Sequence, residues 1–267
     1  MKINAAQVPL EFNVPAARPF YTRLAALGFL SIALTGLVAM GFGLLAGDMS
    51  GLAFELTVLI VGLLLAGALL RFGAWAQVLA ALLSFLVLAL LLPFSIFNLL
   101  HPESAADFIP LVLLVGGAAF GFIGSLVSLI QRRRHALRAT ATSAEALALR
   151  TILTATALVA IASLLLTATA RTTVSAEAKA SAIAVEQKNF LFSPNRIQAR
   201  AGQTIRVVVK NNDSTLHTFT LNEVGVDVSI PPGSERLIEF KAPASGAFIW
   251  YCVPHLGSGM VGTLVVQ

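Results

Sequence analysis

The segment Trp250-Tyr251-Cys252-Val253-Pro254-His255-Leu256-Gly257-Ser258-Gly259-Met260 sets the fold and chemistry of the C-terminal part of this chain. It contains the only cysteine of the 267 residues, with one of the four histidines and one of the four methionines. A mononuclear copper electron-transfer site uses two His and one Cys in a plane, with a distant axial Met. The spacing Cys-x2-His-x4-Met therefore predicts that Cys252, His255 and Met260 supply three of four copper ligands.

Each of these residues alone has an ordinary structural explanation, because a lone Cys is usually a small buried residue. Their combination at this spacing is far harder to explain without a metal. Glycines at 257, 259 and 262 allow a tight turn. Apolar, β-rich segments at 247–250 and 261–266 flank the loop, as expected for a connection between two strands.

The composition divides the chain into two parts. The whole is 57% hydrophobic and 12% charged, with a mean hydropathy of +0.85. The long apolar runs lie in residues 1–171, whereas 172–267 have the composition of a soluble β domain. The single cysteine excludes an intrachain disulfide and a zinc site of four thiolates.

Five apolar stretches predict a helical membrane region over residues 24–170. They lie at roughly 24–46, 52–70, 74–97, 108–130 and 151–170. Each is long enough for a hydrocarbon core of about 30 Å. No stretch contains a histidine, so none offers ligands for a bis-histidine haem. In the fourth, Gly117 and Gly121 predict close packing of two helices.

The basic residues predict the orientation in a cell membrane. Nine Lys and Arg residues fall on one side if the five helices alternate: Lys2, Arg18, Arg23, Arg71, Arg132, Arg133, Arg134, Arg138 and Arg150. Such residues favour the cytoplasmic side. We therefore expect residues 1–23 to be a cytoplasmic segment and the C-terminal domain to be extracytoplasmic (periplasmic or at the cell surface). The pI of 9.9 is explained by this asymmetry, so no nucleic-acid partner is expected.

Residues 171–181 are rich in Ala, Ser and Thr and predict a tether, and 182–267 predict an all-β sandwich. Six β-like runs recur between Gly, Pro and Asn turns: 183–187, 204–210, 217–221, 236–240, 248–252 and 262–266. Two histidines are candidates for the fourth ligand. His101 lies in a loop of the helical part, whereas His217 begins a strand of the sandwich, so we predict His217.

The segment Tyr251 to Gly262 resembles the copper loop of plastocyanin and its blue-copper (cupredoxin) relatives, and Asn211 to Thr220 resembles their first-histidine region. The resemblance covers residues 182–267, about a third of the chain, and the five-helix part resembles no family known to us. It implies a Greek-key sandwich with one type 1 copper per chain. The implied ligands are His217, Cys252, His255 and Met260.

The resemblance also implies how electrons enter and leave. The loop histidine, His255, is the expected exposed port, and Tyr251 offers a second route. One departure is Thr218, where plastocyanins usually have Asn. Because Pro254 has no N–H, we expect a single backbone N–H···S bond to the copper thiolate, donated by Thr218. Trp250 shares the face of Cys252 and is expected in the core.

These features predict a membrane-tethered blue-copper electron carrier rather than an enzyme. It would pass single electrons between membrane or soluble redox proteins, such as cytochromes or oxidases, of a respiratory or photosynthetic chain. Two alternatives stay open: a copper-binding module for storage, delivery or sensing, and the cupredoxin subunit of a larger membrane oxidoreductase. With one Cys and no His-x-His pair, catalysis by a multi-copper centre within the chain is not expected.

Overall fold

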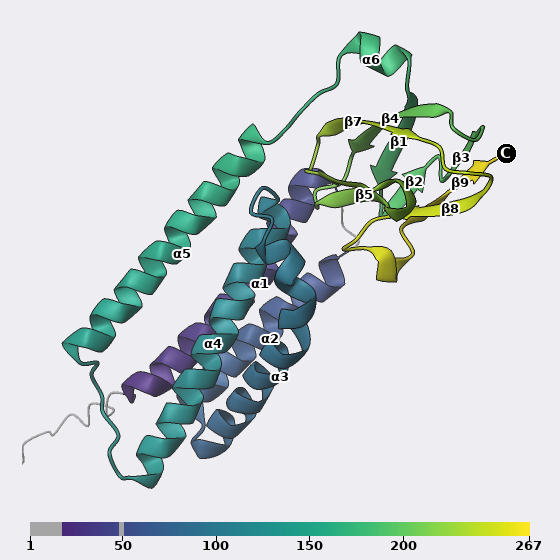
Figure 1. The fold of residues 1–267 in the computed structure, drawn as a ribbon. Coiled ribbons are helices and arrows are strands. Elements are labelled where there is room, and N and C mark those ends of the chain that lie inside the picture. The colour runs from purple at the N-terminus through teal and green to yellow at the C-terminus, as the bar shows by residue number, and fades with distance from the viewer. Residues whose placement is uncertain (1–17, 48–50) are drawn as a thin grey trace, which may run out of the picture.

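The computed structural model describes residues 18–47 and 51–267, and it consists of a helical bundle followed by a β domain (Figure 1). Most of the predicted segment 1–23, with Lys2, lies outside the described residues. The five long helices are α1 (Phe20–Ala46), α2 (Leu52–Arg71), α3 (Ala74–Leu99), α4 (Ala105–Arg133) and α5 (Ser143–Thr169). All five are long and apolar enough to cross a membrane. The prediction of five such helices is confirmed.

Helix α5 begins eight residues earlier than the apolar run suggests. Thr142 caps it: its side chain accepts from the Glu145 N–H, and the Glu145 carboxylate accepts from the Thr142 N–H. This reciprocal capping box satisfies two otherwise unpaired donors. The helix therefore extends through polar residues that hydropathy alone assigns to a loop.

Helix α1 packs closely against α4 at small residues. A Cβ added to Gly28 would lie 2.4 Å from the Gly117 carbonyl oxygen and 2.5 Å from the Gly121 nitrogen. The two backbones can approach so closely only because neither carries a side chain there. The predicted packing role of Gly117 and Gly121 is confirmed. In α5, by contrast, Ser163 is the only residue found buried.

The β domain is a sandwich of two sheets. The strands are β1 (Ile183–Lys188), β2 (Leu191–Ser193), β3 (Arg196–Ala199), β4 (Thr204–Asn211), β5 (His217–Leu221), β6 (Val226–Ile230), β7 (Glu235–Lys241), β8 (Gly246–Tyr251) and β9 (Val261–Val266). One sheet has the order β2-β1-β4-β7 and the other β3-β9-β8-β5-β6. The first pairs β1 with β4 in parallel, and the second pairs β3 with β9 in parallel.

All six predicted strands are present, and three more were not predicted. Strand β2 has only three residues, β3 follows directly on the Ser193-Pro194-Asn195 turn, and β6 is an edge strand paired only with β5. Short strands and edge strands show little alternation of apolar and polar residues, so the sequence pattern does not predict them.

The core between the sheets surrounds the base of the metal-binding loop. Trp250 and Phe219 are both fully buried, and their rings stack with centroids 5.5 Å apart. Phe192 meets the Trp250 ring edge-on at 6.1 Å. Cys252 and Met260 belong to the same buried cluster. The predicted core position of Trp250 is confirmed, and it places the cysteine at the edge of a rigid aromatic core.

Hydrogen bonds join the β domain both to the segment that follows α5 and to the start of α4. In the segment after α5, the Glu235 N–H of β7 donates to the Thr172 carbonyl, and the Thr172 hydroxyl donates to the Glu235 carbonyl, both at 2.8 Å. Lys179 of the short helix α6 (Ala176–Ala180) pairs with the Glu235 carboxylate at 2.6 Å. Near the start of α4, Asp107 Oδ2 accepts the Leu216 N–H at 2.8 Å. The β domain thus rests on the end of the bundle where α4 begins (Figure 1).

Candidate metal centre

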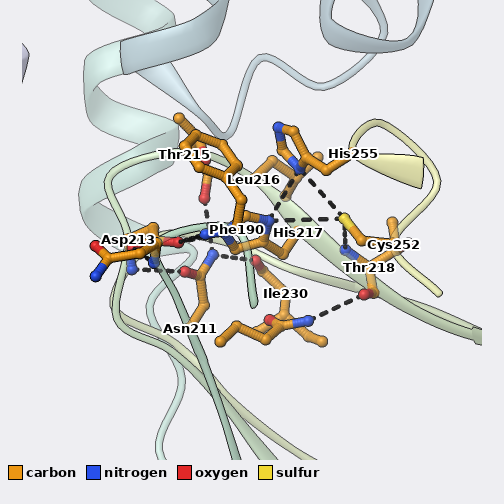
Figure 2. Close-up of polar contacts among 12 residues, drawn as sticks. Phe190, Asn211, Asp213, Thr215, Leu216, His217, Thr218, Ile230, Cys252 and His255 are labelled. Carbon is orange, nitrogen blue, oxygen red and sulfur yellow. Dashed lines mark hydrogen bonds and ion pairs between the residues drawn. The ribbon is translucent and has the colours of Figure 1, made fainter. Parts of the chain in front are cut away.

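Three side chains with metal-binding atoms meet at one end of the sandwich. His217 is the first residue of β5, Cys252 follows the last residue of β8, and His255 lies in the loop between β8 and β9. The two Nδ1 atoms are 3.1 Å apart, and Cys252 Sγ lies 3.6 Å from His217 Nδ1 and 3.3 Å from His255 Nδ1. Figure 2 shows the two rings and the sulfur directed toward one another.

Backbone hydrogen bonds fold the loop so that Met260 returns to the same place. The Cys252 N–H donates to the Met260 carbonyl at 3.1 Å, and the Met260 N–H donates to the His255 carbonyl at 3.2 Å. Gly259 makes the turn with φ +81°, a conformation that favours glycine. Met260 is fully buried. The loop thus brings all three residues predicted from the Cys-x2-His-x4-Met spacing into one site.

His217 is held in place through Nε2, the ring nitrogen that faces away from Cys252. Its Nε2 lies 2.8 Å from Asp213 Oδ2, and the ring has no solvent exposure. This bond assigns the Nε2 proton to the pair with Asp213 and leaves Nδ1 facing Cys252 and His255. The imidazole is therefore oriented to offer Nδ1 to a metal.

Thr218 links the two ligand-bearing segments twice. Its backbone N–H donates to Cys252 Sγ at 3.3 Å, which confirms the N–H···S bond predicted from the lack of an N–H at Pro254. Its hydroxyl accepts the Val253 N–H at 2.8 Å. Threonine at this position therefore still ties the two loops together through its side chain, in place of the asparagine that is usual in plastocyanins.

The electrostatics of the three groups favour a thiolate. Burial raises the pKa of the Cys252 thiol, but hydrogen bonds with His217 and His255 and from the Thr218 N–H bring that pKa down to about 6. Burial lowers the pKa of His217, but Asp213 and the Cys252 sulfur outweigh it and raise that pKa to about 8. The thiolate is the form of cysteine that binds metals.

These donors fit a copper ion. Metal bonds of about 2.0 Å to nitrogen and 2.3 Å to sulfur place the donors of one ion roughly 3.5 Å apart, and the three atoms here are 3.1–3.6 Å apart. Two imidazoles, one thiolate and a buried thioether are the donor set of an electron-transfer copper site, whereas structural zinc sites use four Cys or His ligands.

Comparison with known proteins gives the same result for this part of the chain. The family model of the cupredoxin-like domain matches residues 156–266. Plastocyanin of Vicia faba is 37% identical over 90 residues, which cover 28% of this chain and 87% of that protein. The chain belongs to the plastocyanin-like cupredoxins.

Two further similarities lie in the same region. Chloroplastic plastocyanin of Hordeum vulgare is 35% identical over 89 residues, which cover 29% of this chain and 55% of that protein. The match thus spans only about half of that relative. Among solved structures, dithionite-reduced auracyanin from the photosynthetic bacterium Roseiflexus castenholzii is 20% identical, with a TM-score of 0.30, and covers 33% of this chain and 97% of that chain.

The remaining candidates from the sequence lie at the edge of the ligand cluster or outside it. His255 is half-buried, and its ring lies edge-on to Phe190 at 4.8 Å. Tyr251 is partly exposed, and its hydroxyl accepts from Asn222 at 3.1 Å. His101, the alternative fourth ligand, pairs with Glu103 at 2.7 Å in the loop before α4, and it does not belong to the metal-binding group.

Two residues around the cupredoxin site were not singled out from the sequence. Asn211 is fully buried, and its amide donates to the carbonyls of Thr215 and Ile230 at 2.8 Å each. Asp213 contacts His217 directly. Asn211 is the last residue of β4 and Asp213 follows it, in the segment whose sequence resembles the first-histidine region of plastocyanins. The available signal was the position of Asp213, four residues before the predicted ligand.

Proposed function

We propose that this cupredoxin is a membrane-tethered carrier of single electrons, with one copper ion held by His217, Cys252, His255 and Met260. The observation that carries the proposal is the convergence of two Nδ1 atoms and one sulfur within 3.6 Å, from a strand and a loop far apart in sequence. A copper ion bound there supplies a one-electron couple, because thiolate suits Cu(I) and imidazole suits Cu(II).

The residues of the chain keep the donor atoms in place between oxidation states. His217 and Cys252 are fully buried, and Thr218 bonds both to the sulfur and to the loop that follows it. A site with such supports needs little rearrangement when its charge changes. This rigidity favours electron transfer over storage or delivery, which need the metal to leave.

Electrons reach the partner through the exposed side of the loop. Val253 and Leu256 are 41% and 50% exposed and flank His255. Residues 242–267 contain no Asp, Glu, Lys or Arg, so a partner docks on an apolar surface with little electrostatic steering. Tyr251 offers the second route. Partners of this kind are cytochromes or oxidases of a respiratory or photosynthetic chain.

The domain lies on the extracytoplasmic side of a cell membrane. Supporting this, the Phe20 N–H of α1 donates to the Arg138 carbonyl, and Arg23 bonds to Ala139. The start of α1 and the α4–α5 connection, both rich in arginine, therefore lie together at the end of the bundle away from the cupredoxin domain (Figure 1). Arginine-rich ends favour the cytoplasm.

Redox reagents that do not cross the membrane test both the electron-carrier function and the side of the membrane on which the copper domain lies. Right-side-out vesicles holding the copper-loaded chain are reduced with hexaammineruthenium(II) and reoxidised with ferricyanide. We expect the visible thiolate–copper band to bleach and return over repeated cycles, without copper passing to a chelator. Copper lost in each cycle would instead indicate delivery. Bleaching only in inverted vesicles would refute the orientation.

A further inference from the structure

The carboxylate of Asp213 makes three hydrogen bonds beside the metal-binding cluster. Its Oδ2 lies 2.8 Å from His217 Nε2 and accepts the Phe190 N–H at 3.3 Å, while Oδ1 accepts the Asn189 N–H at 2.8 Å. The Asp213 side chain is only 11% exposed. A carboxylate with so little solvent acts on the imidazole largely unscreened.

The turn that this carboxylate holds covers the two histidines. Asn189 and Phe190 have φ values of 54° and 59°, in the left-handed region that residues other than glycine seldom adopt. The Phe190 ring lies edge-on to His217 at 5.9 Å and to His255 at 4.8 Å. Asp213 thus binds the backbone that places an aromatic ring over both imidazoles (Figure 2).

The position of Asp213 is itself fixed. Its N–H donates to Asn211 Oδ1 at 2.9 Å, and Asn211 is anchored through its amide to the carbonyls of Thr215 and Ile230. The carboxylate therefore does not need to reorganise when His217 binds a metal at its other nitrogen.

We propose that Asp213 is a positioning residue that lowers the reduction potential of the copper site. This rests on the proposed function, in which His217 binds copper through Nδ1. A negative charge hydrogen-bonded to Nε2 makes the imidazole a stronger donor. A stronger donor with a nearby negative charge stabilises Cu(II) more than Cu(I), because Cu(II) carries the larger charge.

A matched pair of charge-removing variants tests the role. Asp213→Asn removes the charge at His217, and Asp227→Asn removes one in the same domain at the exposed start of β6, where Asp227 accepts from Thr220. The midpoint potential of the copper-loaded full chain is measured by redox titration of its visible band. We expect an upward shift for Asp213→Asn and a clearly smaller one for Asp227→Asn. Equal shifts, or a fall in Asp213→Asn, would overturn the proposal.

A second measurement uses the unaltered protein, in case Asp213→Asn does not hold copper. NMR of the reduced, histidine-labelled full chain should show a His217 Nε2–H proton that is strongly deshielded and exchanges slowly with water. A rapidly exchanging proton at ordinary shift would refute the bond to Asp213. A wild-type chain with no visible band after copper loading would refute the proposed function, whereas a band with equal variant shifts refutes only this inference.

Discussion

Replacing Gly262 with alanine tests the packing that holds the copper loop. Gly262 of β9 pairs with Trp250 of β8. A Cβ at position 262 would lie 2.1 Å from Trp250 Cε2, 2.3 Å from Cζ2 and 2.5 Å from Nε1. Carbon atoms in contact are about 3.5–4.0 Å apart, so the indole ring or the strand must move.

The ring has little room to move. Trp250 is fully buried and stacks on Phe219. Overpacking of this kind costs typically about 1–3 kcal/mol. For a domain of 60–100 residues, 1 kcal/mol lowers Tm by about 4–8 °C. Gly262→Ala should therefore lower the melting temperature of the cupredoxin domain by at least about 4 °C. Any shift of Trp250 moves β8, the strand that leads directly to Cys252.

The assay is thermal loss of the visible band in the copper-loaded full chain, with near-ultraviolet circular dichroism as a second probe. Gly257→Ala is the matched control, because a Cβ at that exposed position, in the loop that leads into β9, would meet nothing within 4 Å. The free energy of unfolding of the Gly257→Ala control should differ from that of wild type by no more than about 0.5 kcal/mol. If Gly262→Ala melts within 1 °C of wild type, the packing argument is wrong.

Three further predictions concern contacts around the cupredoxin domain. The Lys179 hydrogen bond holds the pKa of Glu235 below its ordinary value of 4.5, so the stability from this contact is complete above pH 4.5 and is lost as the pH falls through the lower folded value. NMR titration of the Glu235 carboxyl should give a pKa below 4.5 that rises in Lys179→Met, and an unchanged value would contradict the contact. Asp107→Ala removes the acceptor for the Leu216 N–H and should weaken the docking of the cupredoxin domain on the bundle by about 1.5–3 kcal/mol. Limited proteolysis should then cleave residues 171–181 faster than in wild type. Equal rates would show that this bond does not hold the domain on the bundle. Thr218→Val leaves the Val253 N–H without its acceptor and should lower the free energy of unfolding in urea by about 1–3 kcal/mol. The visible band should persist, because the backbone N–H···S bond is kept. An unchanged free energy of unfolding would show that water replaces the hydroxyl.

The metal-binding loop could be predicted from the sequence because three of its four expected ligands lie close together in the chain. Cys252, His255 and Met260 lie within nine residues, and their side-chain chemistry limits the possible metals. His217 needed an argument about which part of the chain is rigid, since spacing alone does not relate residues 35 positions apart. The N–H···S bond from Thr218 followed from the proline at 254, which left few other donors.

Features that depend on three-dimensional contacts were not predictable in the same way. Asp213 has the residue type of a turn position, and its bond to His217 depends on how the four residues between them fold. The Thr218 hydroxyl likewise accepts the Val253 N–H, a contact between residues 35 positions apart that the residue type alone does not predict. The contact between Asp107 and Leu216 joins residues 109 positions apart and has no sequence signal.

Crystals of the copper-loaded full chain, measured on both sides of the copper absorption edge, test the central claim most directly. One anomalous peak per chain is predicted, within bonding distance of His217 Nδ1, Cys252 Sγ and His255 Nδ1, with Met260 Sδ farther away, and absent in Cys252→Ser. A peak at His101 instead, or no peak in the cupredoxin domain, would contradict the account.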